Sequence, residues 1–242
     1  MKLSLLRRHN RGFTLVEMAI VLLIMGLLLG GGLSVLSVQI EQQKFKDTQK
    51  ILEDAKDALV GFAIANGRLP CPATAASLGV ESPAGGGVCT NPYNGFLPAV
   101  TLGIPGADAN GLLPDAWQTP ANSIRYAVTT SNANAATVTN GIQTTTMATF
   151  EATAPLKLRV CASATGITAT TCGAATALTN SAVAVIYSLG KNTGSAGPDE
   201  AANQNNDQVF VSHTPTATFD DQMTWIPSNI LYNRMLQAGR LP

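Results

Sequence analysis

The sequence is poor in charged and catalytic side chains. Only 12% of its 242 residues are charged, roughly half the share in an average soluble protein, and 15 basic residues are balanced by 15 acidic ones. Binding to nucleic acid through its phosphates requires a basic excess, so we expect no direct contact with nucleic acid. The two histidines, His9 and His213, leave little material for zinc centres or histidine-based catalysis. We therefore expect a non-enzymatic protein.

The few charges are unevenly distributed along the chain. The first twelve residues contain four basic side chains, Lys2, Arg7, Arg8 and Arg11, and no acidic one. Residues 18–40 then form a run of 23 residues without a charge, and a helix of about 20 apolar residues spans the hydrocarbon layer of a bilayer. Because Lys and Arg mark the cytoplasmic flank, the sequence predicts a single-pass membrane helix with the later residues outside.

Three interpretations of the apolar run are possible, and they differ in how they account for its length and for Glu17. A secretory signal peptide has an apolar region of only about 7 to 15 residues, which is shorter than the run here. A plain signal anchor fits the length but gives no reason for a carboxylate at the membrane entrance, where an unpaired charge is costly. A third interpretation has to account for both the length of the run and the carboxylate. The simplest reading of Glu17 itself is a carboxylate at headgroup level.

Residues 12–17, with the sequence Gly-Phe-Thr-Leu-Val-Glu, follow a short basic leader and precede the apolar run. This arrangement resembles the cleavage and methylation signal of type IV pilins and type II secretion pseudopilins. The resemblance implies that a prepilin peptidase removes the leader, 1–12, by cutting between Gly12 and Phe13, and then methylates the amino group of Phe13. It further implies that Glu17 of one subunit pairs with this amine of a neighbour, which penalises a wrong register because a buried unpaired charge is expensive.

The same resemblance implies where the protein lies and what it contacts. It describes a minor pilin or pseudopilin held in the bacterial inner membrane, with its head in the periplasm, and then built into a type IV pilus or a type II secretion pseudopilus. The implied partners are other pilin or pseudopilin subunits, the inner-membrane assembly platform and the prepilin peptidase. Many major pilins have a proline at the position of Ser34, and its absence favours a minor subunit.

The residues after the membrane segment predict an amphipathic helix followed by strands. Residues 41–66 place apolar side chains at spacings of three and four, and Asn66-Gly67 with Pro70 ends the pattern. Strand patterns follow at 124–130, 156–161, 183–189, 208–213 and 222–226, and a short helix is expected at 228–238 with a packing stripe of Ile230, Leu231, Met235 and Leu236. The stretch 127–154, rich in Ala and Thr, predicts exposed hairpins or a long variable loop.

Together these patterns predict an α+β fold, and the resemblance implies that it is of the pilin type. Its long N-terminal helix is transmembrane over 13–40 and amphipathic over 41–66. This helix packs on a small antiparallel β-rich head over 67–242.

The four cysteines follow the predicted membrane segment, on the side where disulfides form. Sequential pairing, Cys71 with Cys89 and Cys161 with Cys172, closes small loops. Four cysteines allow three pairings, so this connectivity is one of three. A zinc site is the rival interpretation, but the sequence has no C-x-x-C motif and only His213 to assist.

The loop over 190–207 is rich in acidic and amide side chains, and its Ser-Leu-Gly entry resembles the calcium loop of the major type II pseudopilin. Calcium prefers six to eight oxygen ligands, which here would come from Asp199, Glu200, Asn203, Asn205 and Asp207. The alternative is a cluster of solvated turns, for which such residues are equally typical.

Two functional hypotheses remain after these exclusions. The first is a structural filament subunit that carries no cofactor other than this candidate calcium ion. The second is a signal-anchored periplasmic module whose β-rich head binds a ligand or an adhesion target.

Overall fold

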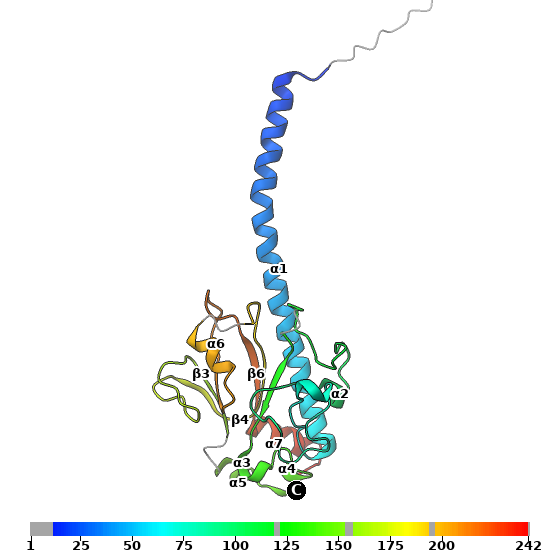
Figure 1. The fold of residues 1–242 in the computed structure, drawn as a ribbon, viewed down its shortest axis with the longest axis vertical. Helices are drawn as coiled ribbons and strands as arrows, with labels where there is room; N and C mark the ends of the chain where they lie inside the picture. The colour runs from blue at the N-terminus through cyan, green and yellow to red at the C-terminus, as the bar shows by residue number, and fades with distance from the viewer. Residues whose placement is uncertain (1–11, 119–121, 153–156, 194–196, 242) are drawn as a thin grey trace, which may run out of the picture. The chain divides into compact units, whose positions relative to one another are not determined.

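The fold is mixed α and β in a computed structural model, which describes residues 12–118, 122–152, 157–193 and 197–241, without the side chains of 28–36 and 151–152. The chain divides into two compact units, Met1–Lys44 and Phe45–Pro242. Figure 1 shows the long helix α1 (Leu15–Asn66), whose residues from Phe45 onward belong to the second unit.

The described part of the first unit is residues 12–14 and the beginning of α1, whose large apolar side chains up to Leu27 are exposed. The large apolar side chains between Phe13 and Leu27 are 44–86% exposed. In the part of the chain whose side chains are described, no helix combines the length and apolar character needed to cross a membrane.

The second half of α1 is amphipathic, as predicted. Leu52, Ala55, Leu59 and Ala63, three or four residues apart, are all at most 1% exposed and form one side of the main core. The helix ends where the sequence predicts, because Gly67 takes a positive φ of 67° and donates its N–H to the Ala63 carbonyl at 2.8 Å, a common helix-ending geometry.

The second unit contains a six-stranded sheet. Its strands are β1 (Gly95–Phe96), β2 (Arg125–Val128), β3 (Leu158–Cys161), β4 (Ala177–Ser188), β5 (Val209–Val211) and β6 (Gln222–Pro227). The central strand is β4, which pairs antiparallel with β2, β3 and β6. Each of the five predicted strand patterns overlaps one of the strands β2 to β6.

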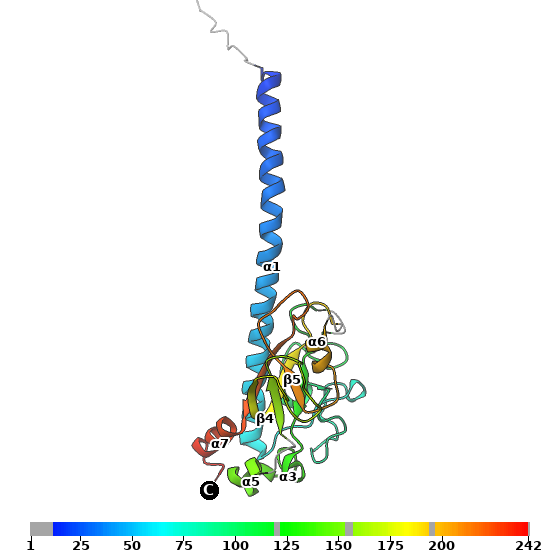
Figure 2. The same ribbon diagram turned by 90° about the vertical axis from the view of Figure 1, so that its left-hand side faces the viewer.

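The second half of β4, residues 182–188, is buried on both faces, and Figure 2 labels this strand within the second unit. Ile186 faces the core that includes α1, and Tyr187 faces a second apolar cluster. A register shift between Ala182 and Ala184 interrupts the alternation of faces, so that Ala182 joins the second cluster and Val183 the first. One strand thereby supplies side chains to two cores.

One strand pair departs from the predicted antiparallel arrangement, because β5 pairs parallel with β3. After β4 the chain passes through α6 (Pro198–Asn203) before it enters β5. Because β3 and β5 both run opposite to β4, they run in the same direction where they lie side by side. The prediction of a wholly antiparallel head was therefore wrong at this pair.

The stretch 127–154, in its described part 127–152, contains three short helical segments after β2 rather than hairpins. It contains α3 (Ser131–Asn134), α4 (Gly141–Thr144) and α5 (Met147–Ala152). Ile142 and Phe150 are at most 1% exposed and belong to the main core. The expectation of an exposed surface insertion was wrong because these two side chains anchor the stretch.

The remaining helices are η1 (Ala75–Ser77), α2 (Ala99–Leu102) and α7 (Ser228–Gln237). The predicted helix at 228–238 is confirmed as α7, but only half of its predicted packing stripe is buried. Leu231 and Met235 are fully buried, whereas Ile230 is 45% and Leu236 56% exposed. Tyr232 of α7 also packs into the main core, and its hydroxyl donates to the Thr145 carbonyl at 2.9 Å.

Candidate functional site

The predicted cleavage point lies before the first turn of α1. Residues 12–14 are outside regular secondary structure, and the Phe13 side chain is 83% exposed. A Cβ atom built at Gly12 would have no described heavy atom within 4 Å. None of the described residues therefore obstructs the peptide bond between Gly12 and Phe13.

Thr14 and Glu17 are hydrogen-bonded to each other at the start of α1. The Thr14 N–H and the Thr14 hydroxyl both donate to Glu17 Oε2, each at 2.8 Å. The Glu17 N–H donates in return to Thr14 Oγ1 at 3.2 Å. This is a capping box, which satisfies backbone donors at a helix start. The sequence analysis did not identify Thr14, although the T-x-x-E spacing is the signal for this motif.

Three carboxylates converge in the second unit. One oxygen each from Glu200 on α6 and from Asp220 and Asp221 lie within 4.8 Å of one another. Glu200 is fully buried, Asp221 is 5% exposed and Asp220 is half-buried. The Asp220 Oδ1 atom is buried and accepts no hydrogen bond from the described residues.

This convergence disfavours the charged form of the aspartates. Burial, with the charges of Glu200 and Asp220 adding to it, raises the pKa of Asp221 from 3.8 to about 7, although a hydrogen bond from Asn203 opposes the rise. Burial and then the charge of Glu200 also raise the pKa of Asp220. A group of buried carboxylates that repel one another is stabilised by protons or by a bound cation.

The entry of the predicted calcium loop lies against this cluster. The Asn192 side chain donates to Glu200 Oε1 at 3.1 Å, and the Lys191 N–H donates to Asp220 Oδ2 at 3.1 Å. Gly190 has a φ of 65°, and a Cβ atom there would overlap Asp220 Oδ1. The position therefore requires glycine for two reasons, its backbone conformation and the approach of the carboxylate.

Of the five predicted calcium ligands, only Glu200 belongs to the carboxylate cluster. Asp199 instead accepts hydrogen bonds from the Ala164 N–H and from His213. Asn203 donates to Asp221 Oδ2 at 2.8 Å and also bonds both the N–H and the carbonyl of Val211.

The last two predicted ligands, Asp207 and Asn205, are not members of the cluster. Asp207 accepts the Val209 N–H at 2.9 Å, and Asn205 is exposed. Sequence reasoning missed Asp220 and Asp221, which follow β5 and come close to α6 only through the fold.

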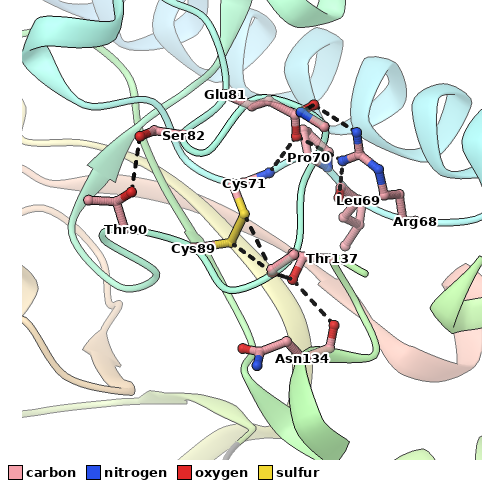
Figure 3. The surroundings of a disulfide bond; sticks show 12 residues. Arg68, Leu69, Pro70, Cys71, Glu81, Ser82, Cys89, Thr90, Asn134 and Thr137 are labelled. Atoms are coloured by element: carbon pink, nitrogen blue, oxygen red, sulfur yellow. Dashed lines mark hydrogen bonds and ion pairs between the residues drawn. A yellow bond between two sulfur atoms is a disulfide. The ribbon is translucent and has the colours of Figure 1, made fainter. Parts of the chain in front are cut away.

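Both disulfides of the second unit join the sequential pairs, Cys71–Cys89 and Cys161–Cys172. Figure 3 shows Cys71–Cys89 beside an ion pair between Arg68 and Glu81. Both side chains are less than 10% exposed. The Glu81 carboxylate accepts two hydrogen bonds from the guanidinium, at 2.8 and 2.7 Å, and one from the Cys71 N–H at 3.1 Å. The ion pair and the disulfide together fix the loop that follows α1.

A groove of about 600 Å³ lies between the second half of α1, β6 and α7. Its lining carries charges of both signs, from Glu53, Lys56, Asp57 and Arg234. Lys56 contacts Glu53 at 3.2 Å, and Thr224 on β6 donates to Glu53 at 3.0 Å. The groove is the feature of the head that best fits the hypothesis of a ligand-binding module.

The comparisons with known proteins concern the N-terminal site. Residues 7–33 match the prokaryotic N-terminal methylation motif. The chain therefore carries the signal of type IV pilins and pseudopilins, as the sequence analysis predicted, and this signal is that of a prepilin peptidase substrate. No curated protein and no solved structure matches the chain.

Proposed function

We propose that the protein is a non-enzymatic structural subunit, a minor pilin or pseudopilin. Prepilin peptidase cleaves it between Gly12 and Phe13 and methylates Phe13, and the mature chain joins a type IV pilus or a type II secretion pseudopilus. The methylation motif at residues 7–33 carries this proposal. The unobstructed peptide bond between Gly12 and Phe13 supports it, because a peptidase needs an accessible bond.

The uncovered apolar surface of the first unit supports assembly through α1. Side chains that are 44–86% exposed between Phe13 and Leu27 require an apolar surrounding. In our proposal the inner membrane supplies it first, with the helix crossing once and the head in the periplasm, and a bundle of like helices in the filament supplies it later. The four basic residues before Gly12 favour this orientation. Other subunits and the inner-membrane assembly platform are then the partners of this surface.

The intact N-terminus of the protein tests this proposal. Mass spectrometry of the terminal peptide is done on protein recovered from membranes of a host with a prepilin peptidase. We expect a chain that begins with methylated Phe13, and a Gly12→Glu variant, which places a charged side chain at the cleaved bond, should keep its leader. A wild-type chain that retains residues 1–12 would contradict the proposal. It would favour a signal-anchored module that binds its ligand in the groove between α1, β6 and α7.

Glu17 has a defined role in this proposal, as the partner of the Phe13 amine of a neighbouring subunit. A Glu17→Ala chain should insert into the membrane and be processed, but it should not enter filaments. Normal assembly of this variant, measured in sheared filament fractions, would contradict the role.

We propose in addition that the carboxylate cluster of the head binds calcium. The residues fit such an ion, because Glu200, Asp220 and Asp221 present oxygens within 4.8 Å of one another and one buried oxygen of Asp220 accepts no hydrogen bond from the described residues. Calcium accepts carboxylate ligands of this kind, and its charge would relieve their mutual repulsion. The chain's own groups around it, Asn192 and Asn203, would orient the carboxylates.

Thermal unfolding with calcium or with a chelator tests the calcium site. Calcium at 100 times its dissociation constant should stabilise the head by roughly 2.7 kcal/mol. An Asp221→Asn variant should lose this effect, whereas Asp207→Asn, outside the cluster, should keep it. An unchanged midpoint in the wild type would remove the calcium proposal and leave the filament proposal intact.

A further inference from the structure

The strand β6 lies at a border of the sheet and has one unpaired side. It pairs with β4, and no other described strand pairs with it. Within the described part of the chain, the backbone of residues 222–226 forms no hydrogen bond to backbone outside this pairing. Alternate residues of a border strand direct their N–H and C=O groups away from the neighbouring strand. The open side of β6 therefore presents backbone donors and acceptors that another strand could use.

This open side faces the groove between the second half of α1, β6 and α7. Five consecutive residues of β6, 223–227, line the groove. Side chains of neighbouring residues in a strand point to opposite faces of the sheet, so a groove that touches all five reaches the strand along its border. Its volume of about 600 Å³ lies within the range of about 300–1,000 Å³ that is typical of ligand sites.

The sequence of β6 does not protect its open side. The strand, Gln-Met-Thr-Trp-Ile-Pro, carries no charged side chain, although proteins commonly place charges on border strands to prevent pairing with other chains. The strand runs beside the second half of α1 (Figure 1), but the contact uses the Thr224 hydroxyl, which donates to Glu53 at 3.0 Å, and not the backbone. An apolar border strand of this kind is the surface to which an extended peptide adds as a further strand.

The two walls of the groove carry opposite charges that are not paired with each other. Asp57 on α1 and Arg234 on α7 both line the groove, and both are exposed. No described residue forms an ion pair with either of them, whereas Lys56 pairs with Glu53 at 3.2 Å. Ile230, which is 45% exposed, adds apolar surface to the same lining. The groove thus offers a ligand backbone groups, one charge of each sign and an apolar contact.

We propose that this groove binds an extended peptide segment of a partner protein, which adds to β6 as a strand and carries a basic residue for Asp57 and an acidic one for Arg234. In this mode of recognition the main-chain hydrogen bonds give affinity and the side chains give specificity. Pairing with β6 of a second copy fits less well, because that strand has no charged side chain to meet either wall. The inference goes beyond the proposed function and does not depend on filament assembly.

The experiment uses the full-length chain in detergent and synthetic peptides as probes. Two peptides of about seven residues, an ordinary strand length, alternate Thr and Val and contain one Lys and one Glu, whose order is exchanged between them. A third peptide repeats the tighter binder with the backbone N–H groups of one edge methylated, which removes strand donors and keeps the side chains. Fluorescence anisotropy measures the dissociation constants, and hydrogen exchange with mass spectrometry locates the backbone N–H groups that the peptide protects.

We expect one of the first two peptides to bind the wild-type chain and to slow exchange within 222–227. The methylated peptide should bind at least about tenfold more weakly, because it loses several backbone hydrogen bonds. Arg234→Glu should weaken binding about fivefold. Lys50→Glu makes the same change of net charge at a side chain that is 76% exposed and outside the groove, and it should stay within about twofold of wild type.

Several results would overturn the inference. These are binding of neither peptide, equal binding of the methylated peptide, protection outside β6, and equal effects of Arg234→Glu and Lys50→Glu. A dimer that Arg234→Glu abolishes would identify a second copy as the occupant and would also overturn it. Because the test involves neither leader cleavage nor filaments, its failure would leave the proposed function intact, and an unprocessed chain would leave this inference intact.

Discussion

The buried ion pair between Arg68 and Glu81 gives the sharpest stability prediction, through the substitution Glu81→Gln. The carboxylate is surrounded only by donors. Oε2 accepts from Arg68 and the Cys71 N–H, and Oε1 accepts from Arg68 and the Gly85 N–H. A glutamine has the same shape, but either orientation of its amide turns an NH₂ group toward two of these donors (Figure 3).

The size of the expected loss of stability follows from the burial of both side chains. Arg68 is 8% and Glu81 6% exposed, so removing the negative charge leaves a buried guanidinium without its partner. Breaking such a pair from one side costs about 3–5 kcal/mol. The pair Lys50–Asp54 is an internal comparison, because its 2.8 Å distance is similar but its side chains are 76% and 63% exposed. Loss of an exposed helical pair of this kind should leave the free energy of unfolding nearly unchanged, because water screens the two charges.

Urea unfolding of the full-length protein in detergent measures both effects. Trp117 and Trp225 lie in the second unit, so tryptophan fluorescence reports on the unit that contains the ion pair. With a slope of about 2 kcal/mol per molar urea, Glu81→Gln should lower the midpoint by about 2 M, whereas Asp54→Asn should leave it nearly unchanged. The reasoning is refuted if the two variants lose the same stability.

Three further predictions concern the head. Without calcium, the free energy of unfolding should fall as the pH rises from about 4 to about 7. In this range the raised pKa of Asp221 keeps a proton on the folded chain that the unfolded chain has released. Urea unfolding in a chelator measures this pH dependence, and Asp221→Asn should flatten it. Gly190→Ala should lower the thermal midpoint and weaken calcium binding, since its Cβ would overlap Asp220 Oδ1; an unchanged melt with calcium would contradict this. Replacing Cys161 and Cys172 by serine should cost about 3 kcal/mol, because their bond closes a short loop of separation 11; equal urea midpoints with and without this disulfide would contradict the entropy argument.

The sequence predicted those parts of the fold that depend on local pattern. Leu52 and Leu59 recur at helical spacing, Gly67 ends the helix, and the apolar β-branched run of β4 marks a buried strand. The parallel pairing of β5 with β3 was not predictable in this way, because it depends on the path of the chain through α6. The helices within 127–154 were missed because Ala and Thr are common in both helices and loops there, and only the burial of Phe150 shows how the stretch is anchored.

The two candidate sites also differ in how far a local sequence pattern could predict them. The N-terminal site is continuous in sequence, so residues 12–17 were sufficient to find it, although the role of Thr14 required the hydrogen bonds to be seen. The carboxylate cluster joins Glu200 to Asp220 and Asp221 across a separation of 20 residues or more. A search confined to one acidic loop therefore found Glu200, a member of the cluster, and Asn203, which hydrogen-bonds to Asp221. The other three residues that it proposed are not members of the cluster.

The bonds of Asn203 have a consequence for how copies of this protein behave when they are crowded. Its amide occupies the N–H and the carbonyl of Val211, and Asp207 occupies the N–H of Val209. These groups lie on the border strand of the sheet, and an open border strand is a template for pairing with another molecule and for aggregation. Asn203 also holds Asp221. The side chain that supports the carboxylate cluster thus also occupies backbone groups of this border strand that could otherwise pair with a second copy of the chain.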